Sequence, residues 1–345
     1  MHGFRAPRWL RNPHLQTLGA AARFFSPPPS HASQESEDLR IPLRILGEPE
    51  WRLHARAWWI LDGAGAKAKR PAVVIVHGIG GSTESAYVVR AAVALHRRGY
   101  HVVRLDLRGA GASVPDVPTL YHAGLSSDLD VVVRYLAADP CVHGVVIFGF
   151  SGGGSMALKL AGELGDNAPA ALRAVVSLSA PLDYTKVSRW MDSIARLPYR
   201  FHVLRGLSNG ARAFARTHPD RAHYRPEDVK RLSSFRHYDG NVICPMHGFR
   251  HVEEYYASAS PGPWLEKITI PALVVHAEDD PMVPGRTVLP WLERASGSVE
   301  GAISKHGGHI GFVAGLDEAS WIHGWSTSEV LAFLDRTLDA TRASL

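Results

Sequence analysis

Short apolar runs alternate with segments of helical spacing along most of this chain. Several runs are continuous and rich in β-branched or aromatic residues, which is typical of strands buried on both faces of a sheet: residues 72–76, 145–148, 174–178 and 272–275. Between them, apolar residues recur every three or four positions, as on the buried face of a helix: Ala86, Val89, Ala92, Val93 and Leu95, then Leu129, Val132, Val133 and Leu136. This alternation predicts an α/β fold with a mostly parallel sheet and helices on both of its faces.

A long segment interrupts the alternation between residue 178 and the strand that starts near residue 270. Its spacing is helical, because Trp190, Ile194 and Leu197 share one helix face. We expect the chain to divide as follows: an N-terminal arm and linker over residues 1–38, an α/β core over residues 39–180 and 269–345, and a helical cap over residues 181–268. Such a cap would exclude water from a site at the sheet edge. Its aromatic residues are candidates either for pocket lining or for the cap's own core: Trp190, Tyr199, Phe201 and Phe249.

The run over residues 145–148 leads directly into a turn that exposes a serine. The turn reads Gly149-Phe150-Ser151-Gly152-Gly153, and residues 154–160 continue with a helical pattern. A serine between such a strand and helix is forced outward, and the glycines on either side of it avoid a collision with the neighbouring turn. The pattern favours Ser151 as a catalytic nucleophile. A glycine-rich turn without a catalytic role is the alternative interpretation.

A second glycine-rich loop, His77-Gly78-Ile79-Gly80-Gly81, follows the run over residues 72–76. Such a loop leaves backbone N–H groups unpaired, and an oxyanion hole requires donors of this kind where negative charge develops during acyl transfer. We expect the donors to be the N–H groups of Ile79 and of Gly152, the residue after the nucleophile. An ordinary glycine turn or a phosphate cradle is the alternative, although no dinucleotide fingerprint and no P-loop lysine is present.

The run over residues 272–275 is followed by three consecutive acids, Glu278, Asp279 and Asp280. An acid just past a strand end can accept the Nδ1–H of a histidine and fix its tautomer. Asp280 is favoured, because the prolines that follow it stiffen the turn. Asp279 and, less so, Glu278 remain alternatives, as does an acidic loop that is merely solvated.

Two histidines, His306 and His309, follow a short strand-like stretch over residues 299–303. His309 is favoured as the catalytic base, because the glycines on both sides of it leave room for a serine and a substrate. His306 remains the alternative. The order Ser151, Asp280, His309, each after its own strand, is the order of triad members in α/β-hydrolases.

Beyond these residues, the chain resembles the YheT-like branch of the α/β-hydrolases, which is related to eukaryotic α/β-hydrolase domain esterases and phospholipases. The resemblance spans nearly the whole chain and is carried by the following segments: Arg11 to Leu18, Asp106 to Gly111, Tyr238-Asp239, Gly248-Phe249, Tyr255-Tyr256, Asp279 to Pro281 and Gly307 to Phe312. It implies an α/β-hydrolase fold with a sheet of the eight-stranded type, and it implies hydrolysis of carboxylic esters, extending to acyl lipids.

Two positions depart from this branch. The branch usually carries a leucine after the nucleophile, where this chain has Gly152, and an asparagine where it has Ser155. Gly152 still supplies its N–H group, so the expected oxyanion donor is retained. We expect a more open floor of the acyl pocket, which affects the size of the substrate more than the type of reaction.

The composition is that of a soluble enzyme. The chain has 345 residues, 46% of them hydrophobic, which is enough for one large core with an inserted lobe. Its two cysteines make a disulfide framework improbable and suit a reducing compartment. The N-terminal residues are interrupted by arginines and lack the apolar core of a signal peptide, and no stretch has the ~20 apolar residues of a membrane span. We therefore expect a monomeric, cytoplasmic protein.

The formal net charge of +5 is mild, and much of the excess lies between Lys186 and Arg231 in the cap. A basic surface of this kind predicts a weak peripheral contact with anionic membranes, and a simply solvated cap surface is the alternative interpretation. No nucleic-acid fold signature accompanies the charges, so nucleic acid is not an expected partner. His247 and His251 are four positions apart, but no third ligand is evident, so neither a metal nor a cofactor is expected.

Together these patterns predict a serine hydrolase that cleaves short- to medium-chain acyl esters or acyl lipids through a Ser-His-Asp acyl-enzyme mechanism. A thioesterase, acyltransferase or peptidase could use the same triad. An α/β-hydrolase fold that binds ligands without catalysis is the alternative from a different class, and it predicts a broken triad.

Overall fold

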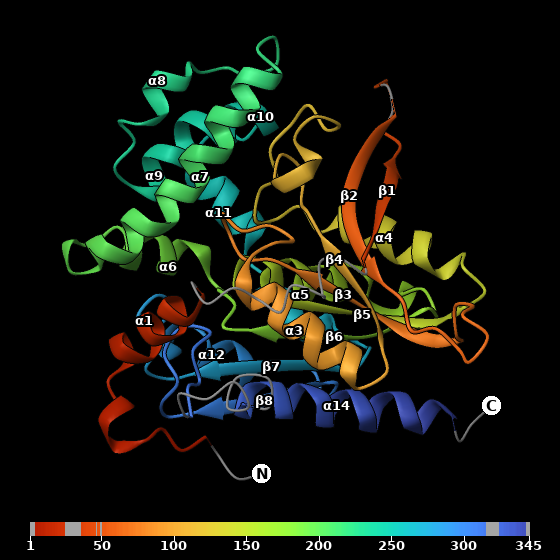
Figure 1. The fold of residues 1–345 in the computed structure, drawn as a ribbon. Helices are drawn as coiled ribbons and strands as arrows, with labels where there is room; N and C mark the ends of the chain where they lie inside the picture. Colours follow the sequence, from red (N-terminus) through yellow and green to blue (C-terminus); the bar gives the residue numbers. More distant parts are fainter. Residues whose placement is uncertain (1–3, 25–35, 46, 49, 315–323, 343–345) are drawn as a thin grey trace.

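The computed structural model describes residues 4–24, 36–45, 47–48, 50–314 and 324–342, and one sheet of eight strands forms its centre (Figure 1). The strand order is β1-β2-β4-β3-β5-β6-β7-β8. The strands are β1 (Glu37–Leu43), β2 (Trp51–Trp58), β3 (Arg70–Val76), β4 (His101–Leu105), β5 (Val142–Phe150), β6 (Leu172–Leu178), β7 (Ala272–Ala277) and β8 (Val299–Ser304). β2 is antiparallel to both of its neighbours, and the other pairs are parallel. The predicted mostly parallel sheet is confirmed.

Helices cover both faces of this sheet. One face carries α4 (Ser127–Ala137) and α5 (Gly152–Leu164), and the other carries α3 (Ala86–Arg97) and α14 (Trp325–Arg342). Successive side chains of a strand point to opposite faces. In β3, Val74 and Val76 therefore pack in the first layer, and Val73 and Ile75 pack in the second. Burial on both faces explains why the central strands are continuous apolar runs.

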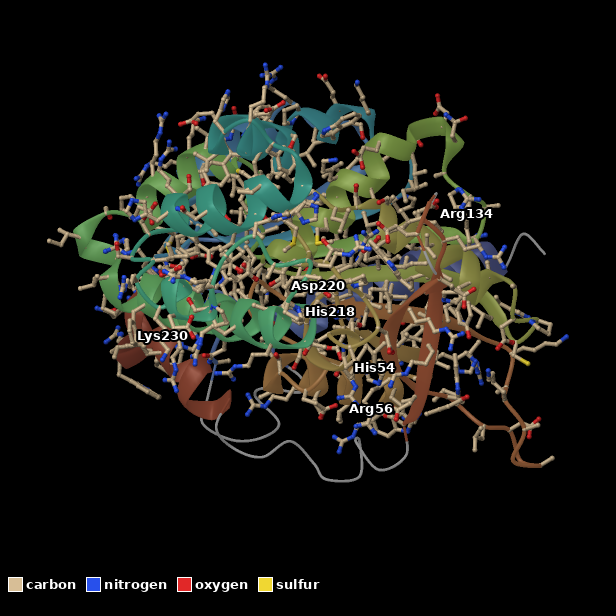
Figure 2. All side chains as sticks on the ribbon, turned by 90° about the horizontal axis from the view of Figure 1, so that it is seen from above. His54, Arg56, Arg134, His218, Asp220 and Lys230 are labelled. Atoms are coloured by element: carbon tan, nitrogen blue, oxygen red, sulfur yellow. The ribbon has the colours of Figure 1, made fainter. Side chains whose placement is uncertain are left out.

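The loop after β4 is anchored by a buried carboxylate. Asp106 accepts hydrogen bonds from the backbone N–H groups of Thr83 (2.7 Å) and Ala112 (3.0 Å), and its Oδ2 lies 3.0 Å from Nδ1 of His54. Figure 2 shows His54 on β2, two residues before Arg56. At Gly111, φ is +50° and a Cβ atom would come within 2.3 Å of the Asp106 carboxylate. The motif from Asp106 to Gly111 is thus structural, and it fixes the segment that follows the Ile79 loop.

Between β6 and β7 the chain forms a set of helices gathered on one side of the molecule (Figure 1). They are α6 (Tyr184–Met191), the 3-10 helix η4 (Ile194–Arg196), α7 (Leu197–Thr217), α8 (Pro226–Val229), α9 (Phe235–Tyr238), the π-helix η5 (Asp239–Ile243), α10 (Cys244–His247) and α11 (Val252–Ala259). The 3-10 helix η6 (Gly262–Lys267) follows them and packs against α5 of the core. Apolar residues of α7, η5 and α11 form a hydrophobic cluster of their own. We refer to residues 181–268 as the cap; these boundaries remain a prediction.

The N-terminal segment folds onto the loop that carries His309. It contains the 3-10 helix η1 (Arg8–Leu10) and α1 (Pro13–Phe24). Gln16, which is fully buried, donates from Nε2 to the carbonyls of Leu10 (2.9 Å) and Val313 (3.2 Å), and its Oε1 accepts the Val313 N–H (2.7 Å). The part of the expected linker over residues 25–35 lies outside the described residues. Residues 4–18 of the expected arm are packed onto the core, because Phe4, Ala6, Leu10, Gln16 and Thr17 are buried.

Within the described ranges, none of the helices combines the length and the apolar character needed to cross a bilayer. The longest helix, α7, carries arginines along its length.

Candidate active site

Ser151 lies in a strained turn between β5 and α5. Its φ and ψ angles are +48° and −119°, a conformation that residues with a side chain rarely adopt. The neighbouring glycines make the turn possible: a Cβ at Gly149 would lie 2.3 Å from the Gly153 backbone, and a Cβ at Gly153 would lie 2.6 Å from the carbonyl oxygen of His77. The structure thus has the sharp strand-to-helix turn that the sequence predicts, and Ser151 lines a cavity at this turn.

The loop around Ile79 is held by two tyrosines. The N–H groups of Gly78 and Gly80 donate to the hydroxyls of Tyr87 (2.8 Å) and Tyr121 (2.7 Å). The N–H of Ile79, between them, donates to no partner among the residues that the structure describes. Burial raises the pKa of Tyr87 to about 12 and that of Tyr121 further, so both phenols stay neutral. Because the tyrosine hydroxyls accept the N–H groups of Gly78 and Gly80, the N–H of Ile79 is the donor between them that remains open to a ligand.

Gly152, the second expected donor, lies beside Ile79. As the first residue of α5, Gly152 has no acceptor for its N–H within the helix. A Cβ at Gly152 would come 2.7 Å from the Ile79 Cγ1 atom and 3.6 Å from the Ile79 nitrogen. The Ile79 side chain therefore occupies space that a leucine side chain at position 152 would need. The floor of the acyl pocket, which the sequence predicted to be more open, is thus partly filled by Ile79. The other departure, Ser155, donates to the carbonyl of Pro181 (2.6 Å).

The acid loop and the histidine loop meet through a buried pair, Asp280 and His309. Oδ2 of Asp280 lies 2.8 Å from Nδ1 of His309, and Oδ1 of Asp280 accepts the N–H groups of Met282 and Val283, both at 2.8 Å. Asp280 and His309 are 2% and 6% exposed. A buried carboxylate that accepts two backbone bonds is held rigidly, so it fixes the orientation of the imidazole ring.

The alternatives from the sequence lie elsewhere. Asp279 pairs instead with His306, with 3.1 Å between Oδ2 and Nδ1, and it accepts the Gly308 N–H at 3.0 Å. The His306 side chain is 43% exposed and is not part of the cavity wall, and Glu278 is exposed. The geometry therefore favours Asp280 and His309 over these three residues.

Ser151 and His309 line the same cavity but form no direct hydrogen bond here. The bond of His309 Nδ1 to Asp280 leaves Nε2 as the nitrogen available for a serine. In sites without substrate, the bond between nucleophile and base is often long and tightens when substrate binds.

The cavity has a volume of about 620 Å³ and lies between the core and the cap. Of the aromatic residues expected to line it, Tyr199 and Phe201 do so, whereas Trp190 and Phe249 do not. Trp190 instead donates to the carbonyl of Pro281 (2.9 Å), and Phe249 packs on Tyr255. Trp190 therefore ties the cap to the core, whereas Phe249 belongs to the cap's own packing.

The paired histidines of the cap do not form a joint site. His247 Nε2 lies 2.8 Å from the carbonyl oxygen of Leu120, and His251 accepts the Glu254 N–H through Nδ1 at the start of α11. Burial lowers the pKa of His247 to about 4, so it is neutral. In the part of the chain that the structure covers, no three metal-ligating side chains come together.

Four groups around this site were not singled out from the sequence as contributors: Gln16, Thr17, Tyr87 and Tyr121. Oγ1 of Thr17 accepts the N–H of His309 at 2.9 Å, so α1 holds the histidine loop directly. The N-terminal segment that resembles the YheT-like branch was the available signal for the first two. Nothing in the sequence pattern marks the two tyrosines.

Comparisons with known proteins agree with this architecture. The family model of the alpha/beta hydrolase fold matches residues 71–316. "Putative esterase YheT" of Escherichia coli (strain K12) is 30% identical over 267 residues, covering 76% of this chain and 77% of that protein. Phospholipase ABHD3 of Mus musculus is 23% identical over 248 residues, covering 72% of this chain and 59% of that protein.

Among solved structures, the Pyrococcus furiosus esterase Pf2001 has the same fold, with a TM-score of 0.57 at 18% identity and coverage of 90% of this chain and 95% of that one. The predicted family is confirmed. The chain belongs to the α/β-hydrolase fold family, within its YheT-like branch of ester hydrolases.

Proposed function

We propose that this chain hydrolyses carboxylic esters through an acyl-enzyme on Ser151, with His309 as general base and Asp280 as the acid that orients it. The observation that carries the proposal is the buried Asp280–His309 pair, 2.8 Å apart, in the same cavity as a serine on a strained turn. An α/β-hydrolase fold used only for binding would have no need of all three groups.

In the first step, Oγ of Ser151 attacks the ester carbonyl carbon and Nε2 of His309 takes its proton. Asp280 stabilises the resulting imidazolium through Nδ1. The tetrahedral intermediate then releases the alcohol, which takes its proton from His309. In the second step, a water molecule gives its proton to His309 and attacks the acyl-enzyme, and the carboxylic acid leaves as Ser151 regains its proton.

The developing negative charge on the carbonyl oxygen would be held by the N–H groups of Ile79 and Gly152. Their side-by-side placement and the absence of a competing acceptor for Ile79 support this assignment. Loss of one such donor typically raises the barrier by ~3–4 kcal/mol.

The substrate class we infer is short- to medium-chain acyl esters or acyl lipids. The cavity is large enough for a medium acyl chain, and apolar side chains such as Val187, Met191 and Ile310 form much of its wall. The phospholipase name of the ABHD3 relative points to the same class. Monomeric action in the cytoplasm remains a prediction.

The entrance to the cavity supports contact with a lipid surface. Leu18 of α1 and Phe201 of α7 line the cavity and are 53% and 68% exposed. α1 and α7 meet there, because His14 Nδ1 lies 2.6 Å from the Tyr199 hydroxyl. Further exposed apolar side chains belong to α1, to α7 and to η4, which directly precedes α7: Leu15, Leu197 and Ile194. Exposed apolar groups around a cavity mouth are typical of an interaction site.

Charge favours an anionic lipid surface, although not through the whole basic segment expected from the sequence. Arg205 lines the cavity and is exposed. Other cations of the cap are paired with acids: Arg221 with Glu48, and Arg225 with Asp228. We therefore infer a weak contact in which apolar side chains of α1, η4 and α7 enter the lipid headgroup region and Arg205 meets anionic headgroups.

The proposal is tested with Ser151→Ala and a series of p-nitrophenyl esters of graded acyl length. We expect turnover by the variant to fall to the background rate, with the circular dichroism spectrum and melting temperature close to those of the wild type. The wild type should prefer short to medium chains. Turnover of these esters by Ser151→Ala at the wild-type rate would contradict the assignment.

A further inference from the structure

Asp239 is a buried acid in the wall of the proposed catalytic cavity that the mechanism above does not use. It is 8% exposed and begins the π-helix η5, between α9 and α10. A π-helical turn carries one more residue than an α-helical turn, which changes the direction of its side chains, and such turns are frequent at functional sites.

The carboxylate of Asp239 is only half satisfied. Its Oδ2 accepts a hydrogen bond from the Tyr256 hydroxyl at 2.6 Å. Its Oδ1 accepts none from any residue that the structure describes. Among the residues that the structure describes, no cation forms an ion pair with Asp239: Arg236, three positions before it, pairs with Glu253. The like charge of Asp192 further raises the pKa of Asp239. Burial raises the pKa of Asp239 to about 7.

Aromatic rings surround this carboxyl group. Of the tyrosines that line the same cavity, five respond to its charge: Tyr121, Tyr184, Tyr238, Tyr255 and Tyr256. The negative charge of Asp239 contributes to the raised pKa of each of them, which places all five phenols in its electrostatic neighbourhood. Tyr121 also braces the Ile79 loop, so this neighbourhood adjoins the proposed oxyanion site.

Oδ1 of Asp239 is not enclosed by protein, so within the cavity it can accept a hydrogen bond from a ligand. We propose that Asp239 and these tyrosines form a polar subsite that selects esters bearing a hydrogen-bond donor, a hydroxyl or an ammonium group, at a distance from the ester bond. The donor bonds Oδ1 of Asp239. The tyrosine faces pack against the adjoining methylene groups or against the cation. This inference rests on the proposed esterase function and narrows its substrate class.

A purely structural role for Asp239 is the competing explanation. The hydrogen bond between Asp239 and Tyr256 links η5 to α11, and this link needs only one of the two carboxylate oxygens of Asp239. The two roles differ in what a substitution does. Loss of a structural tie lowers the hydrolysis of all esters by a similar factor, whereas loss of a subsite lowers the ratio between esters with and without the donor.

The test measures kcat/KM for p-nitrophenyl esters with unsubstituted, ω-hydroxy and ω-dimethylamino acyl chains of graded medium length. A second series places the same groups on the alcohol, with hydrolysis followed by acid release. We expect the wild type to prefer a donor-bearing ester over its unsubstituted counterpart by about tenfold or more at one or more lengths in one series.

In Asp239→Leu this preference should fall by about tenfold or more. In Asp239→Asn, which has nearly the same shape and keeps the test available if the leucine variant does not fold, preference for the ammonium ester should be lost. If the donor that the subsite binds is a hydroxyl group, Asp239→Asn should keep part of the preference for the ω-hydroxy ester. The control is Asn241→Ala, because Asn241 lies exposed on the same π-helix and bonds only the carbonyl of His237; its preference should equal that of the wild type.

The subsite is overturned if the wild type shows no preference in either series, or if Asp239→Leu and Asp239→Asn keep the wild-type ratio while all rates fall together. Failure of the esterase proposal gives a different result, since unsubstituted esters would then not be hydrolysed by the wild type in a Ser151-dependent way.

Discussion

At the scale of single residues, the chemistry depends on which acid holds His309. Asp280 is bound to His309 Nδ1 and to two backbone N–H groups, whereas its neighbour Asp279 bonds His306 and the Gly308 N–H. Adjacent side chains on one loop thus have different partners, so each can be removed separately.

Asp280→Asn should lower kcat by about 10³–10⁴-fold at neutral pH, because an amide does not hold the imidazole in the required tautomer or stabilise the imidazolium. Asp279→Asn, the matched control, should change kcat by less than about threefold. Steady-state kinetics on a p-nitrophenyl ester measure both. A larger loss in the Asp279 variant would transfer the role to Asp279 and His306.

The choice between these acids could not be made from the sequence, because both follow the same strand in the same loop. The sequence favoured Asp280 through the stiff turn behind it, and the geometry now supports that choice. Ser151 was easier to predict, because the glycines around it are required by contacts within its own turn, 2.3 Å in the case of Gly149.

Asp239 should make the stability of the fold depend on pH. Its pKa is about 7 in the folded state because of burial, with Asp192 raising it and the Tyr256 bond lowering it, against about 3.9 in an unfolded chain. The folded state therefore holds an extra proton between these values, and its stability falls as pH rises from about 4 to about 7.

In Asp239→Asn this loss should be absent. Relative to the wild type, the variant should gain unfolding free energy between about pH 5 and about pH 8, by on the order of 1–3 kcal/mol. Urea denaturation at the two pH values measures the difference. If the difference in unfolding free energy between variant and wild type were the same at both pH values, Asp239 would already be ionised in the folded protein at the lower pH.

At the scale of elements, α1 acts as a support for the histidine loop. Thr17 accepts the N–H of His309, and the Gln16 side chain bonds both the N–H and the carbonyl of Val313. The contact is close, because a Cβ at Gly308 would lie 2.7 Å from the Pro13 carbonyl oxygen. The position of the proposed base thus depends on a helix from the opposite end of the chain.

Thr17→Val removes the acceptor for His309 N–H with little change of shape. We expect the free energy of unfolding to fall by about 1–3 kcal/mol and kcat to fall about tenfold, since a buried N–H loses its partner and the ring loses a support. Thr217→Val is the control, because Thr217 is exposed and bonds only within α7; it should change stability by less than about 0.5 kcal/mol. Wild-type kcat in Thr17→Val would show that α1 does not position the base.

The elements were predictable to different degrees. β3, β5, β6 and β7 each contain an apolar run because both faces of the sheet are covered there, and the sequence therefore shows them clearly. β1 lies at the edge of the sheet and its pattern alternates between exposed and buried residues, so its run is weaker. The packed α1 and the π-helix η5 were not predictable, because both depend on contacts between distant segments.

At the scale of the whole molecule, the cavity opens where α1 and the start of α7 meet, and Figure 1 shows α1 close to α6 on this side. The exposed apolar side chains of Leu18, Ile194 and Phe201 belong to α1, to η4, which directly precedes α7, and to α7. A substrate from a lipid surface could reach Ser151 directly if this face were against that surface. The sequence indicated a charged cap, but it could not show that apolar residues of two distant segments share one opening.

The double variant Ile194→Ser, Phe201→Ser should bind vesicles about tenfold or more weakly than the wild type, because each lost apolar side chain removes about 1.5–3 kcal/mol of transfer free energy when fully buried. Co-sedimentation at low salt with anionic and neutral vesicles measures it, with Leu61→Ser as the control, since Leu61 is 58% exposed in a different part of the chain. The wild type should prefer anionic vesicles. Equal binding of wild type and double variant, absence of a preference for anionic lipid, or pelleting without vesicles would each contradict the proposed surface.

The central claim is that Ser151 becomes acylated, and the most direct measurement is covalent trapping followed by peptide mapping. The intact protein is treated with a fluorophosphonate and its mass is determined, together with the mass of Ser151→Ala treated in the same way. We expect one adduct per chain, located on Ser151, lost in Ser151→Ala and formed slowly in Asp280→Asn. An unmodified wild-type chain, or an adduct on another residue that persists in Ser151→Ala, would contradict it.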